Sequence, residues 1–215
     1  MKQTFGTGDM TILVTGGAGY IGSHMVLSLV DAGERVIVLD DLSTGFVWAV
    51  PKGVELVVGD TGDAGLVSGL LQKHKIEAVV HFAAKIVVPD SVSDPLGYYH
   101  NNTSNARTLI ECAVKQGVKH FIFSSTAAVY GEPQQNPVTD TETLKPINPY
   151  GRSKLMVEWM LQDTAKAHDL TFAILRYFNV AGADPQMRSG QSSKEATHLI
   201  KVAVQTALRM RSGME

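Results

Sequence analysis

The sequence predicts an α/β protein with a doubly wound parallel sheet, and three observations support this fold class. Short apolar runs rich in β-branched residues alternate along the chain with longer segments of helical periodicity. The apolar runs show little polar alternation, which is typical of strands buried on both faces of a sheet. A glycine-rich turn follows the first run directly. Right-handed crossovers between such strands place helices on both faces of one sheet.

The elements follow one another in a regular order. The first strand is expected at residues 11–15 (TILVT), after which Ile21, Met25 and Leu29 recur at helical spacing until Gly33 ends the helix. Further strands are expected at residues 35–39, 54–58, 78–82, 120–124 and 171–177. Further helices are expected at about 64–74, 96–113, 150–166 and 197–211. This succession is typical of a Rossmann-type fold, in which ligands bind at the carboxyl ends of the strands.

The composition excludes several classes of protein. The chain has 215 residues, of which 44% are hydrophobic and 19% charged, with a formal net charge of −2. This balance is ordinary for a globular protein and gives no clustered basic surface for nucleic acid. No apolar run reaches the roughly 20 residues of a membrane helix, and the first ten residues lack the apolar stretch of a signal peptide. The single cysteine, Cys112, lies in an apolar helical pattern and is expected in the core, so we expect a cytoplasmic protein without nucleic-acid or membrane partners.

The glycine-rich turn, residues 15–22 (TGGAGYIG), predicts a dinucleotide site. Its glycines can be aligned as Gly16, Gly19 and Gly22, or with Gly17 in place of Gly16. Glycine permits the tight turn and lets a pyrophosphate approach the backbone at a helix N-terminus. Asp40 ends the second strand 18 residues after Gly22, close to the ~20 expected for the acid that binds a ribose 2′-OH. No arginine adjoins Asp40, which favours NAD over NADP.

Three other polar residues at strand positions have competing interpretations. Asp41 either contacts the ribose or caps a turn, and Asp60 either contacts the adenine or forms an Asx turn. His81 lies within an apolar strand and is interpreted as a core histidine. No His/Cys cluster has the spacing of metal ligands, so no metal site is expected.

Tyr150 and Lys154 predict a redox site. They stand at positions i and i+4 of a helix and therefore share a face. A free tyrosine has a pKa of about 10, and a nearby ammonium and a cationic nicotinamide ring are expected to lower it. Tyr150 then both accepts and donates a proton. Ser124, Ser125 and Thr126 end the fifth strand, and we expect at least one of these hydroxyls to bind substrate and at least one to be structural.

With these features in place, the chain resembles the extended short-chain dehydrogenase/reductase superfamily and, within it, the UDP-glucose 4-epimerase family. The matching stretches are residues 14–24, 38–45, 80–84, 98–102, 123–131, 148–154 and 175–179. The resemblance implies a tightly held NAD and an interconversion of UDP-glucose and UDP-galactose through transient oxidation at sugar C4. It implies that Tyr150 takes the proton of the 4-OH, that Thr126 bridges the 4-oxygen to Tyr150, and that Lys154 binds the nicotinamide ribose.

The resemblance also assigns binding residues. The implied cofactor contacts are Gly16, Gly19, Tyr20, Ile21, Gly22, Asp40, Asp41, Thr44, Gly45, Asp60, Thr61, Phe82, Ala83, Ala84, Asn101, Ser124, Tyr150, Lys154, Tyr177 and Phe178. The implied substrate contacts are Thr126, Tyr150, Asn179 and His198. Two roles stay open. Lys85 stands one residue before the position, Ile86, where some members carry a cofactor-contacting lysine, and His198 stands where an asparagine often meets the nucleotide.

The resemblance implies two regions: an NAD-binding domain at residues 1–180, and the start of a truncated substrate-binding region at residues 181–215. Members of the family run well past 300 residues, so the C-terminal substrate domain is expected to be largely absent, and one expectation for the chain is an inactive fragment. Another nucleotide-sugar dehydratase or reductase, or a non-catalytic NAD-binding module, are the alternatives. Ala127 and Ala128 replace the acidic pair usual in the dehydratases and argue against that activity. Full-length relatives pair through the helices that hold Asn101 and Tyr150, which implies a homodimer.

Overall fold

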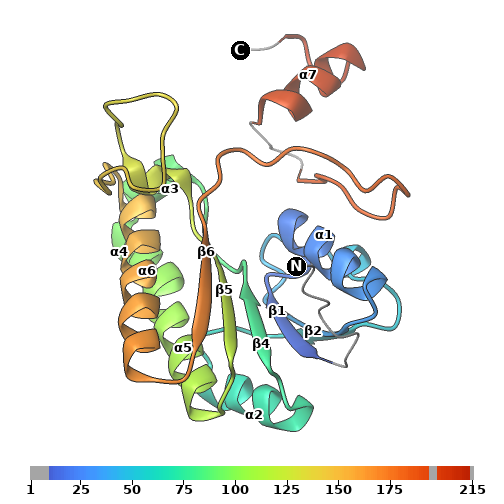
Figure 1. Ribbon diagram of the computed structural model, residues 1–215. Helices are drawn as coiled ribbons and strands as arrows, with labels where there is room; N and C mark the ends of the chain where they lie inside the picture. The colour runs from blue at the N-terminus through green and yellow to red at the C-terminus, as the bar shows by residue number, and fades with distance from the viewer. Residues whose placement is uncertain (1–9, 194–197, 214–215) are drawn as a thin grey trace, which may run out of the picture.

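Six parallel strands form a single sheet in the computed structural model, which describes residues 10–193 and 198–213 (Figure 1). The strand order is β3-β2-β1-β4-β5-β6, so the order reverses between β1 and β4. The predicted doubly wound fold is confirmed. The strands are β1 (Thr11–Thr15), β2 (Arg35–Asp40), β3 (Glu55–Val58), β4 (Ala78–His81), β5 (His120–Ser124) and β6 (Thr171–Leu175).

Helices connect these strands. The α-helices are α1 (Tyr20–Asp31), α2 (Ala64–His74), α3 (Val88–Ser93), α4 (Pro95–Tyr98), α5 (Asn105–Lys115), α6 (Pro149–Ala167) and α7 (Leu199–Ala207). Two 3₁₀ turns, η1 (Val47–Ala49) and η3 (Ala127–Tyr130), and one π-helical turn, η2 (Tyr99–Ser104), complete the list. The sequence predicts the position of most elements to within a few residues, but α3 is absent from its expectations. Of the last predicted helix, residues 199–207 are helical, and Thr197 lies outside the described residues.

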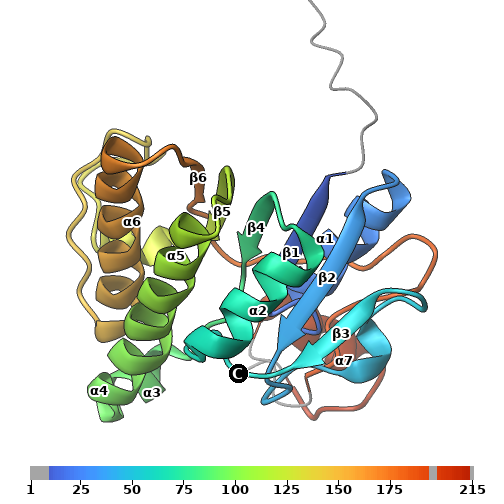
Figure 2. The same cartoon turned by 90° about the horizontal axis from the view of Figure 1, so that it is seen from below.

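Two apolar layers enclose the sheet, because successive side chains of a strand point to opposite faces. Helix α1 covers one face and α2, α5 and α6 cover the other (Figure 2). The layer on the α1 face contains Ile12, Val14, Val36, Val38, Ala78 and Val80 with Val26 of α1. The layer on the other face contains Leu13, Leu39, Val79, Phe121 and Phe123 with apolar residues of α2, α5 and α6. Helix α7 lies apart from the sheet (Figure 1).

The edge strands β3 and β6 correct the expectation that every strand is buried on both faces: Val58 of β3 is 60% exposed, and β6 is the more exposed strand of the two. Strand β6 ends at Leu175, two residues earlier than predicted, and pairs with β5 at the edge of the sheet. Phe172 and Leu175 are each 37% exposed, whereas no residue of β1 is exposed. The reason is positional: α1 lies over the other end of the sheet, and among the described residues no further strand adjoins β6. An apolar strand sequence records what a strand can bury, not its place in the sheet.

The predicted 96–113 helix is continuous but irregular. It begins at Pro95 and contains the π-helical turn at Tyr99–Ser104, in which the backbone hydrogen bonds join residues five apart instead of four.

His81 is confirmed as a core histidine: it is 2% exposed, its Nδ1 lies 2.6 Å from the Thr15 hydroxyl, and burial lowers its pKa to about 3. Cys112 is likewise buried. In the part of the chain that the structure describes, no helix is long and apolar enough to span a membrane.

Candidate active site

The predicted site residues gather along the carboxyl edge of the sheet. Because all six strands are parallel, the segments that follow them meet at this one edge. Backbone hydrogen bonds connect neighbouring segments: Gly16 N–H donates to the Leu39 carbonyl (2.8 Å) and Phe82 N–H to the Thr15 carbonyl (2.9 Å). Farther along the edge, Ala127 N–H donates to the Tyr177 carbonyl (3.0 Å). The strand ends that carry the predicted site residues therefore come together at one edge of the sheet.

The glycine turn is held by contacts that leave no room for a side chain at three of its four glycines, Gly16, Gly17 and Gly22; at Gly17 a Cβ would lie 2.8 Å from the Val38 side chain. Gly16 has φ +70°, and a Cβ there would lie 2.6 Å from the Ala83 nitrogen. A Cβ on Gly22 would lie 2.0 Å from the Gly16 carbonyl oxygen. At Gly19 the nearest atom, the same carbonyl oxygen, would lie at 3.3 Å. Gly16 and Gly22 are therefore required by the fold, whereas Gly19 is the position at which the turn is open on its outer side.

Asp40 ends β2 with its carboxylate turned toward the glycine turn. Its two oxygens accept hydrogen bonds from the backbone N–H groups of Ala18 and Leu42, both at 2.9 Å. The side chain is buried, and burial raises the pKa of this carboxyl against those two hydrogen bonds. A carboxylate has about four acceptor positions, so capacity for a ribose hydroxyl is left. A Cβ on Gly45 would lie 2.9 Å from this carboxylate, so Gly45 keeps the following loop close to it.

Asp41 and Asp60 both form local turns. Asp41 accepts from the backbone N–H of Ser43 at 2.9 Å and from its hydroxyl at 2.6 Å. Asp60 accepts from Gly62 N–H at 2.6 Å and from the Asn105 amide at 2.8 Å. The structure thus supports the turn interpretation of both residues, and it leaves the ligand contacts as predictions. Beside them, Thr61 is buried and Thr44 is exposed.

Tyr150 and Lys154 share one face of α6, as predicted, and Asn148 caps that helix by accepting from Gly151 N–H at 2.8 Å. Lys154 is 2% exposed, and its ammonium donates to the Ser124 carbonyl at 2.9 Å and lies 5.0 Å from the centre of the Phe123 ring. Burial lowers the pKa of Lys154 to about 7. Burial also raises the pKa of Tyr150 above 10.0, against a hydrogen bond with Thr126 that lowers it. In the chain without NAD, desolvation of the phenol therefore outweighs the neighbouring groups, and the lowering expected from the ammonium together with the nicotinamide ring stays a prediction.

The three hydroxyls that end β5 have three different partners. Ser124 hydrogen-bonds the hydroxyl of Tyr177, and Ser125 donates to Glu158. Thr126 accepts from Ala128 N–H at 3.1 Å and so begins η3. The Thr126 side chain also acts on the Tyr150 phenol, whose pKa it lowers. Ser125 is the structural hydroxyl among the three, and Thr126 is the one next to Tyr150.

The π-helical turn η2 brings two consecutive asparagines to one loop. Both Asn101 and Asn102 accept from Lys85 N–H, at 3.0 and 2.8 Å. Asn102 also donates to the Lys85 carbonyl at 2.9 Å and to the Ser153 hydroxyl at 3.1 Å. This fixes the backbone that follows the predicted cofactor contacts Phe82, Ala83 and Ala84. The Lys85 ammonium itself lies 5.9 Å from the centre of the Tyr98 ring.

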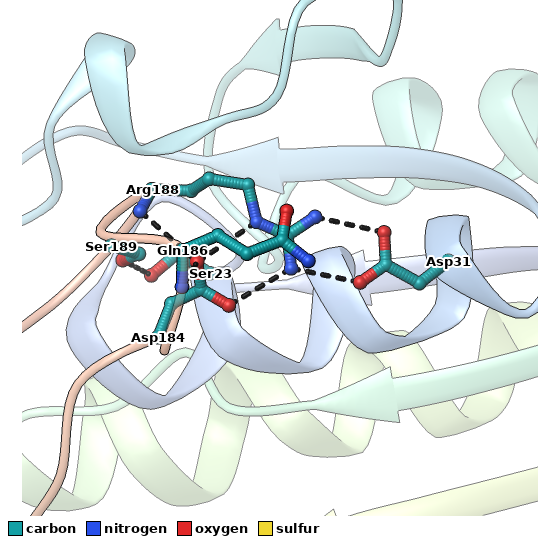
Figure 3. A network of polar contacts seen from close by, with 6 residues as sticks. All are labelled: Ser23, Asp31, Asp184, Gln186, Arg188 and Ser189. Carbon is teal, nitrogen blue, oxygen red and sulfur yellow. Dashed lines mark hydrogen bonds and ion pairs between the residues drawn. The ribbon is translucent and has the colours of Figure 1, made fainter.

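The segment after β6 lies along the outer side of α1, where six residues form a polar network (Figure 3). Arg188 donates to both oxygens of Asp31 at 2.8 Å and to Asp184 at 2.8 and 2.9 Å. The Ser189 hydroxyl lies 2.7 Å from that of Ser23, and the Tyr20 phenol donates to the Gly182 carbonyl at 2.6 Å. The start of the predicted substrate region is thereby attached to the helix that begins at the glycine turn.

The remaining predicted residues are less enclosed. Ile21 is half-buried in the first turn of α1, while Phe178 is 76% exposed and Asn179 is exposed. His198 stands immediately before α7 with its Nδ1 2.7 Å from the Gln191 amide nitrogen. Within the described residues, His198 has no hydrogen bond to the other predicted site residues. The structure therefore assembles the predicted cofactor residues more fully than the predicted substrate residues.

The residues at this edge fit NAD. The turn is open at Gly19, the N–H groups of the first turn of α1 adjoin it, and Asp40 has acceptor capacity left. Among the described residues, no lysine or arginine forms an ion pair with Asp40. A cation beside this residue is what would favour the 2′-phosphate of NADP. The described ranges also contain no group of three His, Cys, Asp or Glu residues that could hold a metal ion.

Comparison with known proteins gives the family. Residues 12–212 match the NAD dependent epimerase/dehydratase family. The chain belongs to this family. Its relatives include a UDP-glucose 4-epimerase of Azospirillum brasilense, 54% identical over 200 residues that cover 93% of this chain and 58% of that protein.

Solved members of the epimerase/dehydratase family have the same fold. A UDP-glucose 4-epimerase from Brucella ovis in complex with NAD superposes with a TM-score of 0.89 at 41% identity, over 93% of this chain and 62% of that chain. The enzyme from Bifidobacterium longum in complex with NAD⁺ and UDP gives a TM-score of 0.84 at 35% identity, over 91% and 62%. The chain thus spans about 60% of the length of the curated relatives it matches.

Sequence reasoning missed the buried ion pair behind this site. Glu158, with a fully buried side chain, pairs with Arg176 at 2.6 Å and also binds Ser125. Glu158 lies four residues after Lys154, so a carboxylate on the same helix face as Tyr150 and Lys154 was the available signal. Its partner Arg176 is brought to it by the strand register, which the sequence does not show.

Proposed function

We propose that this chain is the cofactor-binding part of a UDP-glucose 4-epimerase, which interconverts UDP-glucose and UDP-galactose by transient oxidation at sugar C4. The observation that carries the proposal is the grouping of Tyr150, Lys154 and Thr126 at the sheet edge that also holds the glycine turn and Asp40. A dinucleotide site alone would need none of the first three. The names of relatives at up to 54% identity support the same activity.

Each of the three residues has a distinct task in this proposal. NAD, when bound, supplies the reversible hydride chemistry. Tyr150 accepts the proton of the sugar 4-OH and returns it to the 4-oxygen. Thr126 orients the phenol through its hydrogen bond, and the Ser124 carbonyl fixes the Lys154 ammonium beneath the site. Burial raises the pKa of Tyr150, and the positive charge that NAD⁺ would bring when bound would favour the phenolate.

The binding residues belong to the same proposal. NAD would be held by the glycine turn with Tyr20 and Ile21, by the residues that follow β2 and β3, and by the segments at the ends of β4, β5 and β6. Besides the glycines, these are Asp40, Asp41, Thr44, Gly45, Asp60, Thr61, Phe82, Ala83, Ala84, Asn101, Ser124, Tyr177 and Phe178. Asn179 and His198 contact the UDP-sugar. Residues 1–180 form the cofactor domain, and residues 181–215 begin the substrate region.

Location and assembly are part of this proposal too. A cytoplasmic location is consistent with the free, buried thiol of Cys112. A homodimer through the helices that hold Asn101 and Tyr150 is consistent with the apolar side chains that α6 exposes, Trp159 at 52% and Met156 at 37%.

The test compares the 215-residue chain with the same chain extended by the remaining C-terminal part of the Azospirillum relative. Both proteins are incubated with UDP-galactose, and UDP-glucose formation is followed by chromatography. We expect both to bind NAD and the extended protein to interconvert the two sugars. If the extended protein binds NAD but never interconverts them, the epimerase proposal fails and a non-catalytic NAD-binding module takes its place.

A further inference from the structure

Glu158 is a buried carboxylate on α6 that the proposed chemistry does not use. Its side chain has 0% exposure, and its two donors come from different strand ends. Nη2 of Arg176 donates to Oε2 of Glu158 at 2.6 Å, and Nε of Arg176 donates to both carboxylate oxygens at 3.1 Å. The Ser125 hydroxyl donates to Oε1. Charge-assisted hydrogen bonds of this kind fix the geometry of the groups that make them.

Both donors stand next to a residue of the site. Ser125 follows β5 and directly precedes Thr126, while Arg176 follows β6 and directly precedes Tyr177. The two segments are also tied to each other, since Ala127 N–H donates to the Tyr177 carbonyl at 3.0 Å. Arg176 in addition donates to the Tyr130 hydroxyl at 3.2 Å, at the end of η3. One carboxylate therefore connects the ends of β5 and β6 to the helix that carries Tyr150 and Lys154.

We propose that Glu158 is a positioning residue, which holds Ser125 and Arg176 against α6 so that Thr126, the residue after Ser125, keeps its place beside the helix face of Tyr150 and Lys154. The inference rests on the proposed function, because it concerns the group proposed as the proton acceptor. A purely structural ion pair would stabilise the fold and leave the ionisation of Tyr150 unchanged. That difference separates the two roles.

The test is an NMR titration of the 215-residue chain carrying ¹³Cζ-labelled tyrosine, with the Tyr150 resonance identified by its loss in Tyr150→Phe. The Thr126 hydrogen bond lowers the pKa of Tyr150, so releasing Thr126 raises the titration midpoint. We expect a rise of about 0.7 pH unit, the equivalent of one hydrogen bond, in Glu158→Gln and in Ser125→Ala. Ser125→Ala keeps the ion pair with Arg176, and so stays informative if Glu158→Gln does not fold.

Asp163→Asn is the matched control, since it makes the same carboxylate-to-amide change on the exposed side of α6, where Asp163 pairs with Lys166. An upward shift in Ser125→Ala with an unchanged midpoint in Asp163→Asn supports the inference. An unchanged or lowered midpoint in Ser125→Ala, or an equal shift in Asp163→Asn, overturns it. The titration needs neither NAD nor sugar. Its result is therefore independent of whether the extended protein interconverts the two sugars.

Discussion

The ammonium of Lys154 donates a 2.9 Å hydrogen bond to the backbone carbonyl of Ser124. This contact joins the middle of α6 to the end of β5 in a place that water scarcely reaches, because Lys154 is 2% exposed. A carbonyl dipole does not offset the loss of hydration of a full charge. Burial therefore favours the neutral amine and lowers the pKa of Lys154 to about 7.

The first prediction concerns the pH dependence of stability. Between about pH 7 and 10.5 the unfolded chain binds a proton at Lys154 that the folded chain has lost, so the free energy of unfolding rises with pH across this window. The contribution of this group is about 1.4 kcal/mol per pH unit. Lys154→Met removes it. Denaturant unfolding of wild type and Lys154→Met at a series of pH values measures the difference in slope.

Lys166→Met is the control for this experiment, because Lys166 is an exposed lysine on the same helix. It is expected to keep the wild-type slope. Parallel pH curves for wild type and Lys154→Met would show that Lys154 stays charged in the folded chain, and that the Ser124 carbonyl compensates its burial.

The second prediction concerns Tyr150 in the extended protein described above. Tyr150→Phe removes only the hydroxyl, so NAD still binds, while reduction of the cofactor by UDP-sugar falls by about 10²–10⁴-fold. NADH absorbance after addition of UDP-galactose measures it. Tyr98→Phe is the matched control, because the Tyr98 phenol donates at 2.6 Å to the Val87 carbonyl. Reduction at the wild-type rate in Tyr150→Phe would remove Tyr150 from the role of proton acceptor.

The third prediction separates two glycines of the same turn. Gly22→Ala places a Cβ 2.0 Å from the Gly16 carbonyl oxygen and should destabilise the fold by about 1–3 kcal/mol. Gly19→Ala meets its nearest atom, the Gly16 carbonyl oxygen, at 3.3 Å, so it should destabilise the fold less than Gly22→Ala does, but its methyl group adds bulk to the turn. We expect Gly19→Ala to lose NAD affinity. Thermal unfolding and calorimetric titration with NAD measure the two effects.

Gly69→Ala is the control for both glycine variants. Gly69 lies inside α2 with no atom within 4 Å of an added Cβ, so alanine there stabilises the helix by about 1 kcal/mol. Its NAD affinity is expected to match wild type. If Gly19→Ala binds NAD as wild type does, the pyrophosphate does not lie on this turn.

Features of local origin could be read from the sequence, and features of tertiary origin could not. The strands, the glycine turn and the shared face of Tyr150 and Lys154 follow from periodicity and spacing. The exposure of β6 could not be predicted, because it depends on which strands and helices adjoin it. The same holds for the ion pair between Glu158 and Arg176, which lie 18 residues apart in sequence and meet only when β6 packs beside α6.

The pKa of Tyr150 shows a second limit. The spacing indicates a neighbouring ammonium, which together with a cationic nicotinamide ring is expected to lower the pKa. The structure shows that burial of the phenol has the larger effect and raises it. Whether desolvation or a neighbouring charge dominates the pKa depends on how deeply the group is buried in the fold. The sequence does not show how deeply a given side chain is buried.

The fourth prediction concerns Arg188, which joins the segment after β6 to α1 (Figure 3). Arg188→Ala removes its hydrogen bonds to Asp31 and Asp184 and leaves the Ser189 and Gly182 contacts with α1 in place. The backbone N–H groups of Gln186 and Arg188 donate to the same Asp184 carboxylate, so they lose an ordered acceptor. We expect faster amide hydrogen exchange and faster proteolysis across residues 181–193.

The pH dependence of this attachment is a further test of the same ion pairs. The Arg188 guanidinium holds the pKa of Asp184 well below its ordinary 3.8. The contribution of Asp184 is therefore complete above pH 3.8 and is lost only as the pH falls below it toward the folded-state pKa. At neutral pH, residues 181–193 should stay protected against amide hydrogen exchange in wild type and in Arg152→Ala. Arg152 is an exposed residue of α6 and serves as the control. Equal protection in Arg188→Ala would mean that the Ser23 and Tyr20 contacts suffice to hold the segment on α1.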